Sequence, residues 1–547
     1  MPVKPEIILK NGIFWTGNRR APYAGHVICS NGRISAIGTS TYTYESARKE
    51  LDLGGRFAMP GFIDAHTHFR IGGGMLNRLD LRAVRSEEEF SDAVRKQAKA
   101  HPAGKWMLGG NWDHENWKSR NLPSKELIDG ATSSFPVFLD RVDTHMALVN
   151  SRGLIAAGIT RHTPDPPGGV IVRDAIGEPT GIVKDAAREI VLRNIPEPPL
   201  EDVIRDIKEA MRLANSLGVT SVNDIGPERD LRAYLELDRQ GELSVRINMV
   251  LPISDYRLLT NRQTTASAAA GNSDWVKLGA VKGFADGSLG AGTAWFFEHY
   301  TDEVSNYGLA TGPLSSGKLG QSALNADRNR IQLAIHAIGD KAVAAVLDIY
   351  GKIQDANPPW DRRFRIEHAQ HLREEDFRRF SDMRIIASVQ PYHCIDDGRW
   401  AARKIGSDRA RFAFPFKRFL DEGITLAFGT DWPVAPLDPL SGIYAAVTRA
   451  TTDGKNPDGW IPEQRIGVED ALSAYTFGSA CASRDENDNG TLEPGKLADV
   501  IVLSKNPLRI PPGELNDLKV VLTVVGGKII YSDGTIYDAE LHGNPAA

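Results

Sequence analysis

Histidines and an aspartate stand at the ends of several apolar segments of this chain. The first pair, His66 and His68, closes the segment PGFIDAHTH. Side chains alternate between the two faces of a β-strand, so we expect both imidazoles on one face. Two imidazoles on one face can chelate a divalent ion. A pair of surface or core histidines would give the same pattern, so the motif alone leaves both explanations open.

Three more segments end in the same way at distant points of the chain. LAIHAIGD carries His336, RIEHAQ carries His368 and LAFGTDWPV carries Asp431. Each has an ordinary explanation, as a hydrogen-bonded histidine or an aspartate that caps a helix. Packing alone gives an apolar strand no reason to finish in a histidine or an aspartate. Without a metal site, each of these residues would need a separate structural explanation. We therefore expect these three residues, with His66 and His68, to converge on one metal site.

A lysine interrupts a further apolar strand, VKGFADGSLG. Burying the charged ammonium of Lys282 is costly. One explanation is an ion pair between Lys282 and Asp286 or another carboxylate. Asp286 shares the face of Lys282 by strand alternation, which makes it a candidate to orient the lysine or a substrate.

The middle of the chain alternates apolar runs with longer amphipathic segments. This pattern predicts βα units and a parallel sheet. A closed barrel presents its chemistry at the carboxyl ends of its strands, where the residues above lie. The fold predicted is an α/β (β/α)₈ TIM barrel, with strands at Ala58–Ala65, Thr220–Ile225, Arg246–Leu251, Val276–Phe284, Ile331–His336, Phe364–His368, Ile385–Val389 and Ile424–Gly429.

Both chain ends carry short strand-like runs separated by turn residues. Because chain termini often lie close together, residues 1–57 and 488–547 are predicted to form one small β-sandwich domain, with the barrel spanning 58–487. The strands expected there are Ile7–Leu9, Gly12–Trp15, His26–Cys29, Ile34–Ile37, Leu51–Leu53, Ala498–Leu503, Val520–Val525 and Lys528–Tyr531.

The gap between the first two barrel strands is too long for a loop and one helix. Residues 72–214 are therefore predicted to be an insertion that caps the barrel mouth. Its expected elements are the helices Glu87–Ala100 and Leu200–Leu217 and the strands Trp106–Gly109 and Val137–Arg141.

Composition narrows the functional class. The chain has 547 residues, 41% hydrophobic and 25% charged, which fits an enzyme with a large core. A net charge of −5 implies no basic face, so nucleic acid is not an expected partner. No run approaches the ~18 apolar residues of a membrane span, and MPVKPEIILKNG lacks the pattern of a secretory signal. The three separated cysteines, Cys29, Cys394 and Cys481, favour a reducing, cytoplasmic location.

Along nearly its whole length the chain resembles the amidohydrolase superfamily. Within it, the similarity is to the YtcJ-like or amidohydrolase 3 group, which includes N-substituted formamide deformylases. The segments that carry the resemblance are PGFIDAHTH, VKGFADGSLG, AIHAIGD, RIEHAQ, SVQPYH, FGTDWPV and the tail GTLEPGKLADVIVLSKNP.

The resemblance implies a role for each motif. His66 and His68 correspond to ligands of one metal, and His336 and His368 to ligands of a second. Lys282 corresponds to a lysine that many relatives carbamylate with CO₂, so that it bridges two metals. Some members work with a single ion, and one or two divalent ions, with Zn²⁺ as the leading candidate, are expected.

The implied chemistry is hydrolysis of a non-peptide C–N bond in a small-molecule amide, formamide or cyclic amide. The metal lowers the pKa of water from ~15.7 toward 7, and Asp431 corresponds to the residue that binds the first metal and acts as general base and then acid. A metal-dependent decarboxylase or other lyase is an alternative on the same scaffold. A non-catalytic assembly protein is another, although such a relative would be expected to lack some ligands. By analogy, a homodimer is expected.

Four residues are candidates for contacts with the substrate. His145 lies in DTHM and has a family counterpart in the pocket; Trp112 lies in GGNWDHENW beside Asp113 and His114. Asp286 and His393, the latter in SVQPYH, complete the set. Ordinary packing or a structural histidine is the alternative for each of them.

Overall fold

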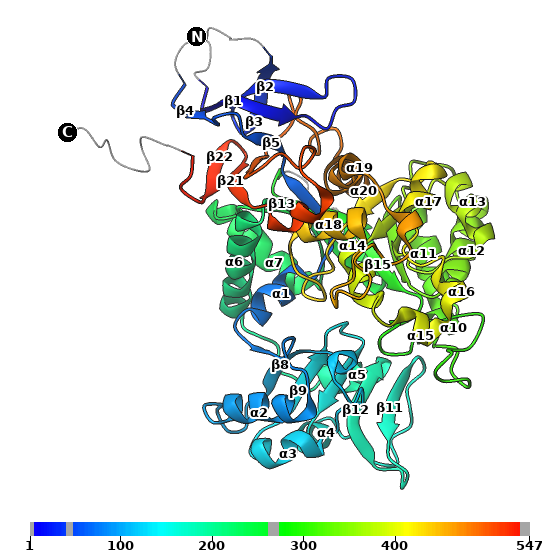
Figure 1. The fold of residues 1–547 in the computed structure, drawn as a ribbon. Helices are drawn as coiled ribbons and strands as arrows, with labels where there is room; N and C mark the ends of the chain where they lie inside the picture. The colour runs from blue at the N-terminus through cyan, green and yellow to red at the C-terminus, as the bar shows by residue number, and fades with distance from the viewer. Residues whose placement is uncertain (1–4, 40–46, 261–272, 537–547) are drawn as a thin grey trace.

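The computed structural model describes residues 5–39, 47–260 and 273–536. Three sheets organise these residues. In Figure 1, a sheet built from both chain ends lies at the top, a barrel lies in the middle, and a layer of strands and helices from residues 79–192 lies at the bottom. Within the described ranges, no helix is both long and apolar enough to cross a bilayer.

Eight parallel strands form the central sheet, which confirms the predicted barrel. Their order is β19-β18-β17-β16-β15-β14-β13-β6. Helices cover the outside, so the strands are buried and apolar along most of their length. The strands are β6 (Phe62–Thr67), β13 (Val219–Ile225), β14 (Arg246–Pro252), β15 (Val276–Phe284), β16 (Gln332–Ala337), β17 (Arg365–His368), β18 (Ile386–Val389) and β19 (Leu426–Phe428).

The barrel closes between its first and last strands. Asp431 N donates a hydrogen bond to His66 O at 2.7 Å, and His68 N donates to Trp432 O at 2.8 Å. A side chain at Gly429 would place its Cβ 2.6 Å from His66 N, so only glycine allows this approach. Closure of the barrel therefore also brings Asp431 beside the two histidines of the first strand.

Helices surround the barrel and fill the loops at its mouth. The surrounding helices are α1 (Phe69–Met75), α6 (Leu200–Ser216), α7 (Glu228–Gln240), α8 (Tyr256–Thr260), α11 (Lys318–Arg328), α12 (Asp340–Ala356), α13 (Glu374–Asp382), α17 (Phe416–Asp421), α18 (Pro439–Thr448), α19 (Val468–Ser473) and α20 (Ser479–Ser483). Short loop helices are α10 (Gly312–Ser315), α14 (Pro391–Asp397), α15 (Ala401–Ile405) and α16 (Ser407–Ala410).

Helix α6 corrects one expectation. Leu200–Leu217 was assigned to the insertion, but α6 buries Val203, Ile207 and Ala210 in the same core as the barrel strands. These residues recur at the three- and four-residue spacing of one helix face, and that face lies against the barrel. The predicted insertion boundary at residue 214 thus falls inside a barrel helix.

Both chain ends contribute to one eight-stranded sheet around its own apolar core. The predicted first barrel strand divides at Gly61, because Phe57–Pro60 pairs with β20 in this sheet. Asn11, expected in a turn, instead lies within one long strand, where the register shifts and its φ is 54°. The strands are β1 (Ile7–Trp15), β2 (Tyr23–Ser30), β3 (Arg33–Gly38), β4 (Lys49–Asp52), β5 (Phe57–Pro60), β20 (Val500–Leu503), β21 (Val520–Val525) and β22 (Lys528–Ser532).

The insertion after the first barrel strand has a sheet and a core of its own. The strand order is β11-β12-β10-β9-β8-β7, and Phe90, Trp112 and Trp117 pack together on one side of the sheet. Its strands are β7 (Leu79–Asp80), β8 (Met107–Trp112), β9 (Val137–Arg141), β10 (Met146–Val149), β11 (Gly169–Arg173) and β12 (Pro179–Asp185). Its helices are α2 (Glu87–Ala98), α3 (Glu126–Thr132), α4 (Ser151–Ala156) and α5 (Ala186–Leu192).

Candidate metal centre and the cavity beside it

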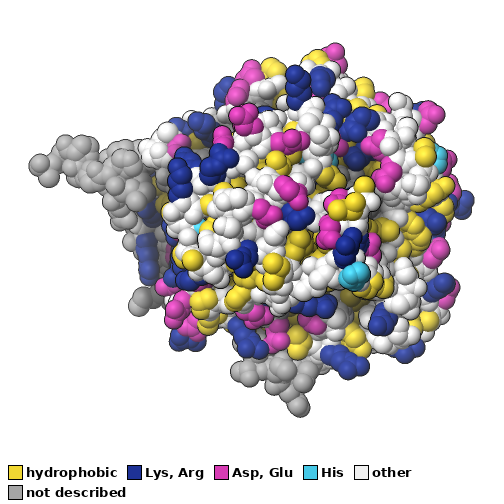
Figure 2. Space-filling model, turned by 90° about the horizontal axis from the view of Figure 1, so that it is seen from below, with side chains coloured by type: hydrophobic (Ala, Val, Ile, Leu, Met, Phe, Trp, Pro, Cys, Tyr) yellow, Lys and Arg dark blue, Asp and Glu magenta, His cyan; other side chains and the backbone are white. Residues whose placement is uncertain are grey.

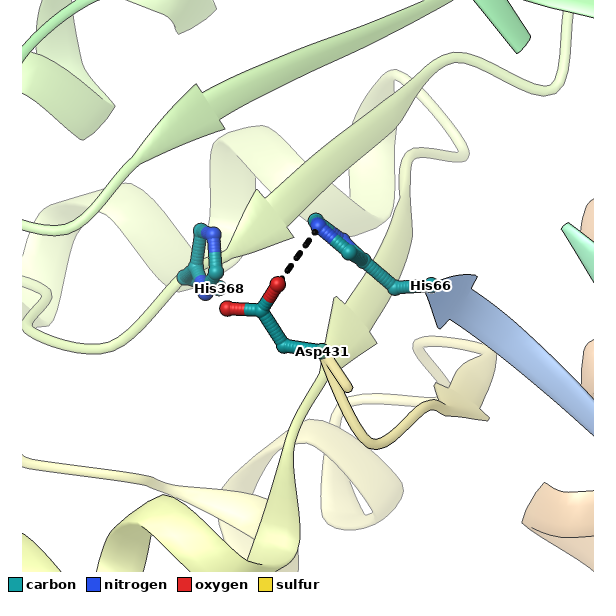
Figure 3. A group of neighbouring side chains, drawn as sticks. All are labelled: His66, His368 and Asp431. Atoms are coloured by element: carbon teal, nitrogen blue, oxygen red, sulfur yellow. Dashed lines mark ion pairs between the residues drawn. The ribbon is translucent and has the colours of Figure 1, made fainter. Parts of the chain in front are cut away.

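Three buried side chains from different strands point toward one another at the barrel mouth (Figure 3). They are His66 at the end of β6, His368 at the end of β17 and Asp431 after β19. One ligand atom from each lies within 4.8 Å of the others. This is the spacing of groups that surround a single ion, and imidazole with carboxylate is a donor set that suits Zn²⁺.

Two imidazole nitrogens face the same carboxylate oxygen. His66 Nε2 lies 3.4 Å from Asp431 Oδ1, and His68 Nε2 lies 3.5 Å from it. The Nδ1 of His68 is 3.1 Å from the carbonyl oxygen of Ile225, to which it donates. The lone pair of His68 Nε2 is therefore directed at Asp431. Lone pairs that converge on one point repel each other unless a cation or a shared proton lies between them, so this arrangement fits a metal ion.

A buried carboxylate fixes the orientation of His66. Glu367 Oε2 lies 2.5 Å from His66 Nδ1. Arg365 donates to Glu367 at 2.7 Å, and Ser388 donates to it at 2.7 Å. Since Glu367 already acts as an acceptor, the proton of the neutral His66 ring resides on Nδ1, and Nε2 presents its lone pair to the site. Sequence reasoning missed Glu367, although two charged residues in the apolar strand RIEH were a usable signal.

The other two histidines complete the ring of imidazoles. The rings of His336 and His368 have centroids 4.5 Å apart. His336 Nε2 donates to Gly287 O at 3.1 Å, which leaves its Nδ1 as the available ligand atom. His368 Nδ1 is buried and has no hydrogen-bond partner in the described part of the chain. Buried polar atoms are rarely left unsatisfied, so this one also fits a bound ion.

Burial keeps the imidazoles in the protonation state that a metal requires. It lowers the pKa of His66, His336 and His368 well below the usual value, and the pKa of His68 to about 4, with the charge of Lys282 acting in the same direction. Burial also raises the pKa of Asp431 to about 7, against the opposing effect of Lys282. Neutral imidazoles are the form that binds a divalent ion.

Lys282 enters the same site from β15. Its Nζ lies 3.4 Å from His66 Nε2, and burial lowers its pKa to about 8. Among the described residues, no carboxylate forms an ion pair with Lys282, so the structure does not support the alternative in which Lys282 pairs with Asp286 or another carboxylate. Asp286 instead accepts hydrogen bonds from the backbone N–H groups of Trp295, Ile338 and Gly339 at 2.8–3.0 Å. It therefore connects the loops after β15 and β16, and its Oδ1 also lies 3.4 Å from His336 Nε2. A contact between Asp286 and a substrate stays a prediction.

A cavity of about 600 Å³, part of it open to solvent, adjoins the metal-ligand candidates. His145 lines it from the insertion, with Nδ1 2.6 Å from Asp185 Oδ1 and its ring 5.1 Å from that of His336. His393 lines it from α14, and its ring lies 6.2 Å from that of His368. Both predicted histidines thus reach the cavity wall.

Trp112 does not line this cavity. Its side chain is fully buried, its indole N–H donates to Leu139 O at 2.8 Å, and its ring packs against Phe90 and Trp117. The prediction of a substrate contact at Trp112 is therefore wrong, because a strand residue facing the insertion core cannot also face the barrel. The next residue, Asp113, does line the cavity.

Sequence reasoning also missed a buried arginine in the cavity wall. Arg141 ends β9, and its guanidinium lies 2.5 Å from Asp113 and 2.6 Å from Asp143. Gly290 makes room for it, because a Cβ there would lie 2.2 Å from Arg141 Nη1. The position of Arg141 at the end of the predicted strand Val137–Arg141 was the available signal, the same one that identified the histidines.

Comparisons with known proteins agree with this architecture. Residues 49–531 match the model of the family described as "Amidohydrolase family". The chain is 38% identical to Protein LONG AFTER FAR-RED 3 of Arabidopsis thaliana, over 96% of this chain and 91% of that protein. It is 33% identical to the putative amidohydrolase YtcJ of Bacillus subtilis, over 88% and 90% of the two chains. It is 26% identical to the N-substituted formamide deformylase of Arthrobacter pascens, over 96% and 98%.

A solved structure shows the same fold. The crystal structure of an uncharacterized metal-dependent hydrolase from Pyrococcus horikoshii superimposes with a TM-score of 0.73 at 28% identity, covering 93% of this chain and 99% of that one. Sequence and fold therefore agree that this chain belongs to the amidohydrolase family, in its YtcJ-like group.

Proposed function

We propose that this protein is a metal-dependent hydrolase that cleaves a non-peptide C–N bond in an amide, formamide or cyclic amide. The observation that carries the proposal is the convergence of His66, His368 and Asp431 within 4.8 Å at the mouth of the barrel, beside a cavity. The family supports hydrolysis, and the relative named N-substituted formamide deformylase supports an amide-type substrate.

The residues proposed to hold the metal lie at one end of the barrel strands, and all of them except His68 are buried. When bound, a divalent ion such as Zn²⁺ would supply two effects: it lowers the pKa of a water molecule so that hydroxide forms near neutral pH, and it polarises the carbonyl group of the substrate. The proposed ligands are His66, His68, Lys282, His336, His368 and Asp431. They provide enough donors for one or two ions.

Lys282 is proposed to become a carbamate, which would turn a cation into a ligand. The reaction forms a bond between the lysine nitrogen and the carbon of CO₂ and releases one proton. It needs the free amine, and the burial of Lys282 without a carboxylate partner in the described chain favours that form. A protein sample equilibrated with ¹³CO₂ should show a carbamate carbon signal that is absent from the Lys282→Ala variant.

Asp431 is proposed to handle the proton in the reaction. As a general base its carboxylate accepts a proton from the attacking water, and as a general acid it then donates that proton to the leaving nitrogen. An amine leaves poorly until it is protonated, so the second transfer matters as much as the first. The place of Asp431 in the cavity wall, beside His66 and His368, supports this role.

His145 and His393 are proposed to hold the substrate against the metal centre. Both line the cavity, and Asp185 fixes the ring of His145 by the 2.6 Å contact to Nδ1. With Nδ1 engaged, Nε2 of His145 is the atom left to contact a polar group of the substrate. The cytoplasmic location and the homodimer stay predictions.

The proposal is tested by product analysis with zinc-loaded protein and a panel of N-formyl and N-acyl amines. Release of a free amine with formate or another acid is expected, and Asp431→Asn should lower kcat at least about 10²-fold with the protein still folded. Release of CO₂ from a carboxylated substrate without amine release would indicate a decarboxylase instead. Full activity in Asp431→Asn would refute the proposed proton transfer.

A further inference from the structure

A hollow on the insertion side continues the cavity away from the metal centre. We call it the vestibule: it comprises two adjoining spaces, lined among others by Arg82, Arg85, Asn116, Lys118, Arg120 and Arg399. Asp113 and Tyr392 line both the vestibule and the inner cavity, and Trp400 does the same. A molecule whose reacting end lies at the metal centre would extend past these residues into the vestibule.

The acidic residues of the vestibule are already neutralised by partners. Asp113 pairs with Arg141 at 2.5 Å, Asp396 with Arg399 at 2.6 Å, and Asp453 with Lys455 at 3.0 Å. Glu115 pairs with Arg403. These carboxylates therefore leave no uncompensated negative charge in the vestibule wall.

Four of its cationic residues, in contrast, form no ion pair within the described part of the chain. Lys118 and Arg120 are exposed, and the structure gives their side chains no hydrogen bond among the described residues. The guanidinium groups of Arg82 and Arg85 donate only to backbone carbonyl groups among the described residues, such as Pro433 O at 2.6 Å from Arg82. The lining of the vestibule thus carries an excess of positive charge, and a concave surface concentrates the electrostatic field of such charges.

The wider surface shows that this excess is local. On the face seen from the insertion side, Lys and Arg side chains alternate with Asp and Glu, and no broad patch of one sign covers it (Figure 2). The chain as a whole is acidic, with a net charge of −5.

We propose that the vestibule binds an anionic group of the substrate, a carboxylate or a phosphate, at the end remote from the scissile C–N bond. The inference rests on the proposed function and narrows its substrate class to amides with an acidic substituent. Lys118 and Arg120 supply attraction at the entrance, and Arg82 supplies donors further in.

Matched probes test this proposal with zinc-loaded protein. The anionic probe is 4-(formamidomethyl)benzoate, its neutral counterpart is 4-(formamidomethyl)benzamide, and 4-(formamidomethyl)phenylphosphonate distinguishes phosphate-like from carboxylate recognition. The wild-type protein should show a KM for an anionic probe roughly tenfold below that for the neutral probe. In the Lys118→Glu/Arg120→Glu variant this ratio should fall to about one.

The control variant is Lys99→Glu/Lys105→Glu, which makes the same charge change on exposed insertion residues that do not line the vestibule. It should keep the wild-type ratio. The inference would be overturned if the wild type showed equal KM values for the anionic and neutral probes, or if Lys118→Glu/Arg120→Glu kept the wild-type ratio of the two KM values. A fall of this ratio to about one in the control variant would overturn it as well.

If no probe is hydrolysed, the proposed function fails, but the inference can still be tested. Calorimetric titration of the protein with the same probes then measures the affinity for each of them. The anionic probe must then bind roughly tenfold more tightly than the neutral one, and the vestibule variant must abolish that difference. Equal binding of the two probes would overturn the inference independently of any activity.

Discussion

The two halves of the cavity wall are built in different ways. The barrel half takes its polar residues from the carboxyl ends of regular strands, and His66, His368 and Asp431 meet there because closure of the barrel leaves them no other position. The insertion half takes His145 and Arg141 from strand ends and loops of a separate sheet. The difference suggests a division of labour: the barrel holds the metal, and the insertion selects what reaches it.

The largest difference between the halves should appear when a proposed ligand is removed. His368→Gln should lose bound zinc and lower kcat/KM by at least about 10³-fold, because the metal supplies several kcal/mol of transition-state stabilisation. Metal content by mass spectrometry and steady-state rates measure this. The matched control is His371→Gln, three residues further on, outside the cavity lining, which should retain its metal. Equal metal loss in both variants would contradict the assignment.

Removing Arg141 should affect stability and the substrate but not the metal. Arg141→Met removes the guanidinium that pairs with both the buried Asp113 and the partly buried Asp143, at a cost of about 3–5 kcal/mol in the free energy of unfolding. Denaturation curves of the zinc-loaded protein measure this. The triple variant with Asp113→Asn and Asp143→Asn should recover much of the stability without recovering the wild-type KM. Loss of zinc from Arg141→Met would show that metal binding by the barrel half of the cavity wall depends on the insertion half.

Glu367 should have an intermediate effect, confined to the barrel half. Glu367→Gln removes the charge that orients His66, and we expect metal affinity to fall by about 10–100-fold. Competition with a zinc chelator gives the affinity. Glu374→Gln, an exposed carboxylate that pairs with Arg418, serves as the control and should match the wild type. Unchanged affinity in Glu367→Gln would remove Glu367 from the account.

Trp112 should give the smallest effect. Trp112→Phe loses one buried hydrogen bond, to Leu139 O, and should cost about 1 kcal/mol of stability. Metal content and KM should match those of the wild type, because the ring faces the insertion core. An increase in KM of tenfold or more, at full metal content, would return Trp112 to the substrate wall.

Strand ends explain what could be predicted from the sequence. His336, His368 and Asp431 each follow an apolar strand of a repeating fold, so their types and positions alone place them at one barrel mouth. The sheet that both chain ends build together could also be predicted, because strand-like runs alternate with turn residues in both end segments. Regular architecture makes such residues predictable because the backbone leaves few alternatives.

Long-range packing explains what was missed. Trp112 and Asp113 are neighbours in sequence, yet one faces the insertion core and the other the cavity. They lie at the end of β8, where its register with β9 shifts between Gly110 and Trp112. The hydrogen bonds from backbone amides to Asp286 depend on a loop 52 and 53 residues later in the chain. Helix α6 was assigned to the insertion because the sequence shows an apolar face but not the surface that covers it.

The central claim is that a metal ion lies among His66, His368 and Asp431. Crystals grown with zinc and measured on both sides of the zinc absorption edge test it most directly, through an anomalous difference map. We predict a strong peak within coordinating distance of these three side chains, with a second between Lys282 and His336 if two ions bind. A map without a peak there, or with zinc held only elsewhere on the protein, would contradict the account.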